Sequence, residues 1–537
     1  MFTMIHSSSV FGVEGKGISV EVDIANGLPQ VNIVGLPDPA VRESVERVRA
    51  AIKNSGFQFP MERITVNLAP ADLRKEGTAF DLAIAAGILT ASGQLDATPF
   101  AGTLLIGELS LNGAVRPVTG VLAMLEEARR VGITRVLLPL QNREEAEWIS
   151  GMELFALTHL SELKDSAHAK AVWEKLSQAG TERRIIEREG PARNDGGTPS
   201  QGPSMGYNQG RTAADPEDYM DIVGQHQGKR AMLIAAAGNH NLLLCGPPGT
   251  GKTMMIRRLP GILPPLDEAE ALEVTKIYSV AGKLLANSGG LMKMPPFRSP
   301  HHSISTGGLI GGGSIPKPGE VTLAHRGVLY LDELPEFPRS VLELLRQPLE
   351  DRVVSIARAR ATVCFPAAIL LAASYNPCPC GYHGHEYGDK RCTCSAAAIS
   401  RYRAKLSGPL LDRIDLQLEI PRPQSLDRSQ DKTHTSTAEL RKLVLAARVR
   451  QKERNAAYSV SCNSELSGKS LRQAARLKPQ AARLLEDAFQ ALGISIRAYD
   501  RLLKLARTIA DLEDSTSVEE MHVAEAIQYR RLDMALS

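Results

Sequence analysis

The sequence has few aromatic residues, little excess charge of either sign and no long apolar run. Aromatic side chains make up 4% of the 537 residues, which argues against base stacking as the main binding device. The formal net charge is +3, so overall charge neither requires nor excludes a nucleic-acid partner. No apolar stretch approaches the roughly 18–20 residues of a membrane-spanning helix. These absences predict an ordinary globular protein without a membrane partner.

The N-terminus also lacks the pattern of an export signal. Residues 1–6 contain no basic segment followed by an apolar one. The seven cysteines therefore favour a reducing compartment and metal or thiol chemistry over disulfide bonds. We expect a cytoplasmic protein. Because 537 residues exceed what one core can hold, we also expect two to four domains.

The most specific motif is a glycine-rich phosphate-binding loop that matches G-x-x-x-x-G-K-[ST]. An apolar stretch, 242–245, precedes it and a plausible helix follows, which argues against a chance Gly/Pro loop. Backbone N–H groups of such a loop bind the phosphates, Lys252 adds a positive charge, and the Thr253 hydroxyl coordinates Mg²⁺. The sequence predicts an ATP and Mg²⁺ site formed by Gly246, Pro247, Pro248, Gly249, Thr250, Gly251, Lys252 and Thr253.

Two further apolar stretches end in polar residues that suit the same site. Residues 328–331 lead into Asp332 and Glu333, which predicts a strand carrying a Mg²⁺ ligand and a residue that orients the attacking water. Residues 368–373 lead to Asn376, which fits a sensor of the γ-phosphate. The alternatives are a strand that ends in acids by chance and a plain Asn-Pro turn.

The order of these motifs along the chain resembles that of AAA+ ATPases of the magnesium-chelatase-like group, specifically the ComM/YifB family. The resemblance covers nearly the whole chain. It rests on 246–253, Phe297-Arg298-Ser299-Pro300-His301-His302-Ser303, His325-Arg326-Gly327, Asp332-Glu333-Leu334-Pro335-Glu336-Phe337, Asn376-Pro377-Cys378-Pro379-Cys380-Gly381 and Leu411-Asp412-Arg413.

This resemblance implies a homo-hexameric ring with arginines at the nucleotide sites. Arg413 takes the position of the arginine finger, which reaches the nucleotide of a neighbouring subunit. Arg497 takes the position of the arginine of the C-terminal helical lid, expected to contact the γ-phosphate of its own subunit, and Arg501 is the fallback. The residues alone leave open a surface ion pair for Arg413 and a solvated helix charge for the other two.

The first 170 residues or so resemble the Lon-type protease fold, most clearly at 105–113 and 117–120. A Lon-like peptidase needs a serine nucleophile and a lysine base. Those positions fall here on Ala79 and Leu122, neither of which can do that chemistry. We therefore expect no peptidase activity, and a scaffold or a DNA-facing collar instead.

Four cysteines form two C-x-C pairs, which predicts a structural Zn²⁺ site. Either His383 or His385 could replace one thiol, and four free thiols are the alternative. A polar, glycine-rich loop of this kind has little else to order it. The expected ligands are Cys378, Cys380, Cys392 and Cys394.

Three basic features favour DNA as the partner, branched or single-stranded. Residues 353–363 predict a hairpin with Arg358 and Arg360 near its tip, where phosphate contacts are expected. Residues 390–405 begin with Lys390 and Arg391 and contain no acid. Residues 441–483 contain eleven Lys/Arg and two Glu. A solvated or inter-subunit face is the alternative for each cluster.

Together these features predict a multidomain α/β protein. The expected parts are a Lon-protease-like α+β domain at 1–187, a flexible linker at 188–216, an AAA+ P-loop α/β core at 217–423 with the cysteine module at 378–394, and a helical lid at 438–537. The resemblance implies an ATP-driven DNA motor, a helicase or branch-migration translocase that acts in recombination during natural transformation. A chelatase subunit or a protein-remodelling ATPase without DNA activity is the alternative, and an ATP-dependent protease ranks last.

Overall fold

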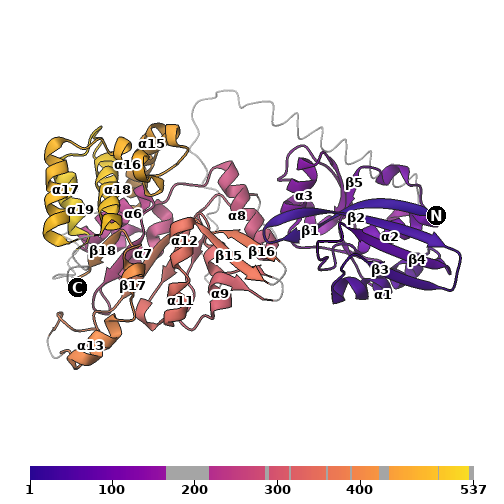
Figure 1. Cartoon of the computed structure of the whole chain (residues 1–537), viewed down its shortest axis with the longest axis horizontal. Coiled ribbons are helices and arrows are strands. Elements are labelled where there is room, and N and C mark those ends of the chain that lie inside the picture. Colours follow the sequence, from indigo (N-terminus) through magenta and orange to yellow (C-terminus); the bar gives the residue numbers. More distant parts are fainter. Residues whose placement is uncertain are drawn as a thin grey trace. The chain divides into compact units, whose positions relative to one another are not determined.

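The computed structural model describes residues 1–164, 217–284, 290–313, 316–358, 361–387, 390–422, 435–493 and 495–530. The chain divides into two compact units (Figure 1). The first contains residues 1–204 and 272–292, and the second contains residues 205–271 and 293–537. The expected linker, 188–216, lies outside the described residues, and the predicted domain boundaries stay predictions.

The first unit is built on a seven-stranded mixed sheet in the order β3-β4-β2-β1-β5-β8-β9. Strand β2 alternates as its sequence predicts, burying Ile18, Val20, Val22 and Ile24 against the core. The elements are β1 (Phe2–Phe11), β2 (Glu14–Ala25), β3 (Gln30–Val34), α1 (Pro39–Asn54), β4 (Arg63–Ala69), α2 (Asp81–Ala91), β5 (Thr103–Leu105), β6 (Glu108–Leu109), β7 (Val115–Arg116), α3 (Val121–Arg130), β8 (Arg135–Pro139), α4 (Arg143–Ala146) and β9 (Glu153–Leu157).

Helix α1 forms where the charged amphipathic stretch predicts it. The Asp38 carboxylate accepts a hydrogen bond from the Val41 N–H at 2.7 Å, and Pro39 occupies the first turn. Val41, Val48 and Ile52 are buried on one face, as the helical repeat requires. Helix α2 is buried along its whole length. The first unit therefore has its own hydrophobic core.

The second unit is built on a five-stranded parallel sheet in the order β11-β14-β17-β10-β18. The three predicted strands are present, β17 beginning two residues later than expected. The elements are α6 (His226–Gly238), β10 (Leu242–Cys245), α7 (Lys252–Ile262), β11 (Phe297–Arg298), α9 (Thr306–Ile310), β12 (Gly311–Gly312), β13 (Lys317–Pro318), α10 (Glu320–Leu323), β14 (Val328–Leu331), α11 (Arg339–Glu343), α12 (Arg346–Asp351), β15 (Val353–Arg358), β16 (Ala361–Pro366), β17 (Leu370–Tyr375), α13 (Ala396–Arg403), α14 (Gly408–Leu411) and β18 (Leu416–Glu419). Helix α8 (Glu268–Val280) begins in this unit, and from Leu272 onwards it belongs to the first.

The C-terminal part of the second unit is helical. Helices α15 and α18 pack against α6 (Figure 1). Their apolar residues join those of the parallel sheet in a single core, which includes Leu244, Val444 and Leu505. This shared core holds the helices on the sheet. The elements are α15 (Thr437–Asn455), α16 (Gly468–Ala475), α17 (Pro479–Leu492), α18 (Ile496–Leu512) and α19 (Glu520–Gln528).

The hairpin predicted at 353–363 is present. Strands β15 and β16 pair antiparallel, and Arg358 opposite Ala361 is the last pair before the turn. Arg360 lies outside the described residues. None of the described helices combines the length and apolarity needed to cross a bilayer.

Candidate nucleotide site and the opposite sheet edge

The phosphate-binding loop connects β10 to α7 at the carboxyl edge of the parallel sheet. Gly249 and Gly251 adopt φ values of 78° and 89°, which glycine reaches without strain. A Cβ on Gly246 would lie 2.3 Å from the Ile420 carbonyl oxygen, so this position has room only for glycine. The Thr250 hydroxyl donates to the Pro247 carbonyl at 3.1 Å. The loop therefore takes the strand–loop–helix arrangement that its sequence predicts.

Lys252 is the first residue of α7 and is 7% exposed. Its ammonium donates to the carbonyls of Gly246 and Pro247 at 2.7 and 2.9 Å, and lies 3.3 Å from Asn376 Oδ1. Burial lowers the pKa of this ammonium, while Cys245 and Asp332 oppose the shift. The predicted lysine and the predicted sensor are thus direct neighbours, although Lys252 and Asn376 are 124 residues apart in the sequence.

Thr253 and Asp332 lie side by side, as expected for two ligands of one Mg²⁺. The Thr253 hydroxyl is 3.1 Å from Asp332 Oδ2, and the Tyr330 hydroxyl donates to Thr253 at 3.1 Å. Ser374 of β17 also donates to the Asp332 carboxylate. A hydroxyl and a carboxylate are hard oxygen donors of the kind that Mg²⁺ prefers, so the residues present fit this ion.

Glu333 follows directly after Asp332, but its side chain is more exposed to solvent. Its φ of 52° is unusual for a residue other than glycine, and its side chain is 53% exposed. Its carboxylate lies 3.7 Å from the His302 ring Nδ1. This exposure leaves the carboxylate accessible to water beside the half-buried Asp332–Thr253 pair.

Arg413 lies at the opposite edge of the same sheet, the amino edge, where the parallel strands begin. Strands β10 and β18 run parallel with Leu242 opposite Leu416, so the residue three positions before β18 is near the amino end of β10. The Asn241 side-chain amide donates to the Arg413 carbonyl at 2.9 Å. Because a four-residue strand spans about 13 Å, Arg413 lies far from its own phosphate-binding loop.

Glu350 is the ion-pair partner of Arg413 in this chain. The Arg413 guanidinium forms an ion pair with the Glu350 carboxylate and donates to the Pro409 carbonyl at 2.7 Å. Neither Asp412 nor Asp415 is the observed partner. Arg413 Nε is buried without a hydrogen-bond partner in the described structure, so the guanidinium is not fully satisfied within this chain.

Arg497 lies near Arg413 and not near the loop of its own chain. Its Nη2 is 3.7 Å from Glu350 Oε1, and its side chain is 64% exposed. Glu350 itself lies at the amino edge, since the Arg352 carbonyl accepts from Ala367 just before β17. The structure therefore places Arg497 beside Glu350, and its expected contact with the γ-phosphate of its own subunit stays a prediction.

The fallback residue, Arg501, is engaged in the interior. Its Nη1 lies 2.5 Å from Asp415 Oδ1, and His240 Nδ1 lies 3.7 Å from the other oxygen of that carboxylate. Burial alone raises the pKa of Asp415, but Arg501 and His240 outweigh burial and hold the pKa far below its ordinary value. Arg501 therefore stabilises the sheet edge.

In the first unit, the two positions that correspond to peptidase residues are apolar neighbours. Ala79 and Leu122 belong to one buried cluster that also contains Ile106 and Val118. The nearby Thr78 hydroxyl donates to Glu108 at 2.5 Å. Lys75 is fully buried, and its ammonium donates to the Leu73 carbonyl at 2.7 Å. None of these contacts pairs a hydroxyl with a lysine.

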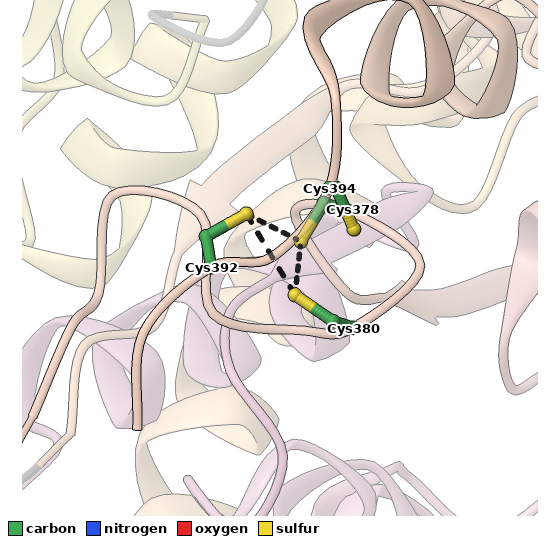
Figure 2. Close-up of side chains that lie close together, drawn as sticks. All are labelled: Cys378, Cys380, Cys392 and Cys394. Atoms are coloured by element: carbon green, nitrogen blue, oxygen red, sulfur yellow. Dashed lines mark hydrogen bonds between the residues drawn. The ribbon is translucent and has the colours of Figure 1, made fainter. Parts of the chain in front are cut away.

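The four cysteines of the predicted metal module come together. Cys378 is buried and the other three are half-buried, and their sulfur atoms lie within 4.8 Å of one another (Figure 2). Lys390 and Arg391 are exposed directly before Cys392. The Lys390 ammonium lies 5.7 Å from the centre of the Tyr382 ring.

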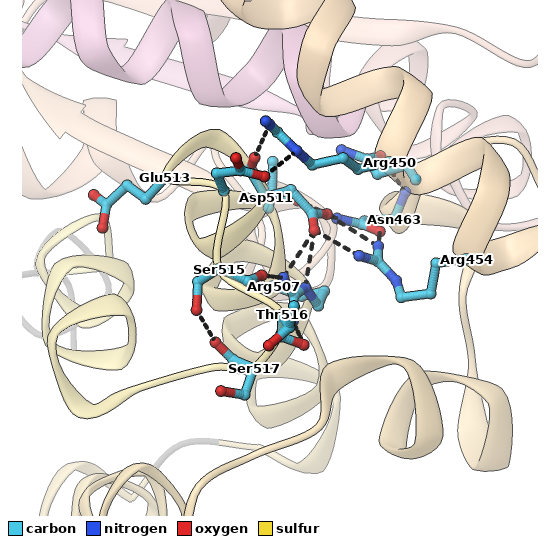
Figure 3. A network of polar contacts seen from close by, with 12 residues as sticks. Arg450, Arg454, Asn463, Arg507, Asp511, Glu513, Ser515, Thr516 and Ser517 are labelled. Carbon is cyan, nitrogen blue, oxygen red and sulfur yellow. Dashed lines mark hydrogen bonds and ion pairs between the residues drawn. The ribbon is translucent and has the colours of Figure 1, made fainter.

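Part of the basic excess at 441–483 serves contacts within the second unit. Arg454 forms two hydrogen bonds with the buried Asp511 carboxylate, at 2.5 and 3.0 Å, and a third with Asn463 at 2.6 Å (Figure 3). Arg450 pairs with Asp514 at 2.6 Å. Arg448 donates to the Ala236 carbonyl at 3.0 Å. Intramolecular contacts thus engage these arginines, and their number is weak evidence for DNA binding.

Four residues that contact the predicted ones have no role in the prediction from sequence. Tyr330 and Ser374 are polar residues within apolar strands, and that irregularity was the available signal. His302 belongs to the motif at 297–303, and the sequence predicted no role for this residue. Glu350 gave no local signal, because only folding brings α12 to Arg413 and Arg497.

Comparison with known proteins is consistent with this geometry. The family pattern described as magnesium chelatase, subunit ChlI, matches residues 218–428, the ChlI C-terminal pattern matches 434–530, and a further pattern for subunit ChlI of Mg-chelatase matches 20–142. The chain is 42% identical to YifB of Salmonella typhimurium, named an uncharacterized protein, over 99% of this chain and 98% of the relative. It is also 42% identical to competence protein ComM of Haemophilus influenzae, over 98% and 97%. A shorter match, 28% identical over 29% of this chain, is with 28% of Lon protease 2 of Bacillus subtilis.

Proposed function

The chain belongs to the ComM/YifB family of magnesium-chelatase-like proteins, and on that premise we propose that it is a ring-forming, ATP-driven DNA motor. Its family and its parallel α/β sheet indicate an ATPase of the AAA+ class that uses ATP and Mg²⁺. The observation that carries the proposal is the convergence of Lys252, Thr253, Asp332 and Asn376 at one edge of that sheet.

Each residue at the carboxyl edge has a distinct role in this proposal. Lys252 and the loop N–H groups hold the β- and γ-phosphates, and Thr253 with Asp332 holds Mg²⁺, which neutralises phosphate charge. Glu333 orients and polarises the attacking water from its exposed position. Asn376, within reach of Lys252, senses whether the γ-phosphate is present.

The second part of the proposal is a homo-hexameric ring in which each nucleotide site contains residues of two subunits. Arg413 and Arg497 lie at the amino edge, on the side away from their own loop, so a nucleotide within their reach belongs to a neighbour. The unsatisfied Nε of Arg413 supports an additional partner there. In this arrangement both arginines act on the adjacent subunit's γ-phosphate.

DNA is the proposed substrate of the motor. The β15–β16 hairpin places Arg358 next to its turn, which suits a pore element that grips phosphates. Exposed Lys390 and Arg391 provide a second basic segment. The competence protein among the relatives supports a role with incoming DNA, and branch migration is the activity that we propose.

The first unit is proposed to be a Lon-like domain that has no peptidase activity. Ala79 and Leu122 offer neither an attacking oxygen nor a base, and they fill one apolar cluster. A scaffold or a DNA-facing collar remains as its role.

A chelatase-type or protein-remodelling ATPase without DNA activity is the second candidate. The names of all three matching family patterns favour a chelatase-like activity. An arginine-bearing hairpin argues against a remodelling pore, which needs aromatic residues to hold a polypeptide.

The deciding experiment measures the steady-state ATPase rate with and without a synthetic four-way DNA junction. It is done at low salt and again at about 0.15 M, because salt screens phosphate contacts. Stimulation that survives the higher salt and is lost in Lys252→Ala supports the DNA motor. A rate that no junction, duplex or single strand changes overturns it and favours the second candidate.

A further inference from the structure

The sulfur atoms of the four clustered cysteines have the spacing of a metal site. Cys378 Sγ lies 3.3 Å from Cys380 Sγ and 3.7 Å from Cys392 Sγ, and Cys380 and Cys392 are also 3.7 Å apart (Figure 2). Cys394 completes a group in which every sulfur lies within 4.8 Å of every other. The four side chains thus surround a common centre.

These distances distinguish between the chemistries open to thiols. A disulfide needs about 2.05 Å between sulfur atoms, and the measured separations are much longer. Four thiolates at about 2.3 Å from one tetrahedral Zn²⁺ lie about 3.8 Å from one another. The measured values of 3.3–3.7 Å are close to that figure. A single four-coordinate ion therefore fits the space.

Neither histidine of the loop belongs to the group of four ligand atoms. His385 Nε2 lies 2.7 Å from a carboxylate oxygen of Glu419, at the end of β18. His383 contributes its backbone N–H, which donates to Cys378 Sγ at 3.4 Å. The ligand set that remains is four thiolates.

We propose that Cys378, Cys380, Cys392 and Cys394 bind one structural Zn²⁺. All four coordination positions belong to the protein, so the ion has no open position for a substrate or water. Its role is to order the turn. Among the described residues from 379 to 395, only Gly381 is buried, so this turn has no hydrophobic core of its own.

The turn that this ion would order lies directly on the nucleotide site. It follows Asn376 at the end of β17, and a Cβ on Gly381 would lie 2.8 Å from the Pro248 ring of the phosphate-binding loop. On its other side, Arg403 of α13 donates to the Pro377 carbonyl at 3.3 Å. With the ion bound, this turn therefore holds the end of β17 and the phosphate-binding loop against each other. It also presents Lys390 and Arg391 next to one of the ion's ligands.

The test is the metal content of the full-length protein, purified without chelators and measured by elemental analysis. We expect about one zinc per chain in the unaltered protein and below about 0.1 in Cys392→Ser. Cys364→Ser is the matched control, because Cys364 is an exposed cysteine outside the cluster and its loss should leave the zinc content unchanged. Zinc well below stoichiometry in the unaltered protein, or stoichiometric iron in its place, overturns the assignment.

A second measurement covers the case in which Cys392→Ser fails to fold. Zinc is removed from the unaltered protein with a mercurial reagent, and Co²⁺ is then added to the reduced apo form. Tetrahedral thiolate coordination predicts intense ligand-to-metal absorption and visible d–d bands at one Co²⁺ per chain. Absence of both bands overturns the proposal. Lys252→Ala should retain its zinc, so failure of the proposed motor and failure of this site are separable.

Discussion

The two edges of the parallel sheet in the second unit carry different kinds of site. At the carboxyl edge, Lys252, Thr253 and Asp332 contact one another or share partners within one chain. At the amino edge, Arg413 and Arg497 share a single carboxylate, that of Glu350, and one Arg413 nitrogen has no partner in the described structure. The nucleotide-binding residues therefore gather at one edge within a single chain, whereas the two arginines lie at the opposite edge.

The difference follows from the physics of parallel sheets. Loops at the carboxyl ends of adjacent strands converge, which brings residues distant in sequence to one nucleotide. Residues before the strands lie about one strand length from that point. In the proposed ring they reach the nucleotide of another subunit. In the proposed ring, this separation of edges makes the ATPase rate depend on assembly.

The largest effect on activity is expected from a change at the carboxyl edge. Lys252→Ala removes the ammonium that contacts the carbonyls of Gly246 and Pro247, so we expect loss of both ATP binding and hydrolysis. A fluorescent nucleotide titration and a steady-state ATPase assay measure the two effects. ATP hydrolysis at the unaltered rate would contradict the assignment of the site.

Alteration of the amino edge should separate binding from hydrolysis. Arg413→Ala leaves the chain's own loop untouched, so nucleotide affinity should persist while kcat falls by about 10³-fold or more. The same two assays apply. Normal turnover in this variant would remove Arg413 from the reaction.

A mixing experiment sharpens this result. Lys252→Ala supplies an intact Arg413, and Arg413→Ala supplies an intact loop, so mixed rings regain active interfaces. Equimolar mixing of the two inactive variants should restore part of the ATPase rate. If mixing restores nothing although mixed rings form, Arg413 does not act between subunits.

Arg497→Ala should have a smaller effect of the same kind. Its side chain is 64% exposed, so water and salt screen its charge more than that of Arg413, and we expect kcat to fall by about tenfold. The matched control is Arg483→Ala, which alters another arginine of the C-terminal helices. Equal rates for both variants and the unaltered protein would assign Arg497 to the solvated surface.

The smallest effect on chemistry is expected from the interior of the amino edge. Asp415→Asn leaves the half-buried Arg501 without its counter-charge, which should lower the free energy of unfolding by about 3 kcal/mol and leave kcat per folded ring largely unchanged. Urea denaturation at pH 7 measures the loss, with Asp487→Asn, an exposed residue of α17, as the control.

The pH dependence of that loss has a definite sign. Because folding depresses the pKa of Asp415, its stabilisation is present above the unfolded value of about 3.9 and is lost as pH falls below it. The difference between Asp415→Asn and the unaltered protein should therefore shrink on acidification from pH 7 to pH 3. A difference that grows would contradict the ion pair.

The sequence predicted the strands that end at the nucleotide site more successfully than the positions of the arginines. Strands at 242–245 and 328–331 were placed correctly because short apolar runs followed by glycine or acidic residues are strong local signals. Arg497 was expected at the nucleotide of its own chain, but it lies beside Glu350. A sequence motif does not encode the sheet edge to which its helix packs. The excess of arginine at 441–483 suggested a DNA surface, but Asp511 (Figure 3) and Asp514 engage part of it.

By itself the sequence determined the chemistry available to this protein. The loop 246–253, the acids after β14 and the four cysteines are local patterns whose residue types dictate phosphate, magnesium and thiolate interactions. Only the tertiary structure decided which of these groups meet. It brought Asn376 to Lys252, placed Gly381 against Pro248 and separated Arg413 from its own loop. The reason is physical: residue type sets what a side chain can bind, whereas strand order and strand direction set its neighbours.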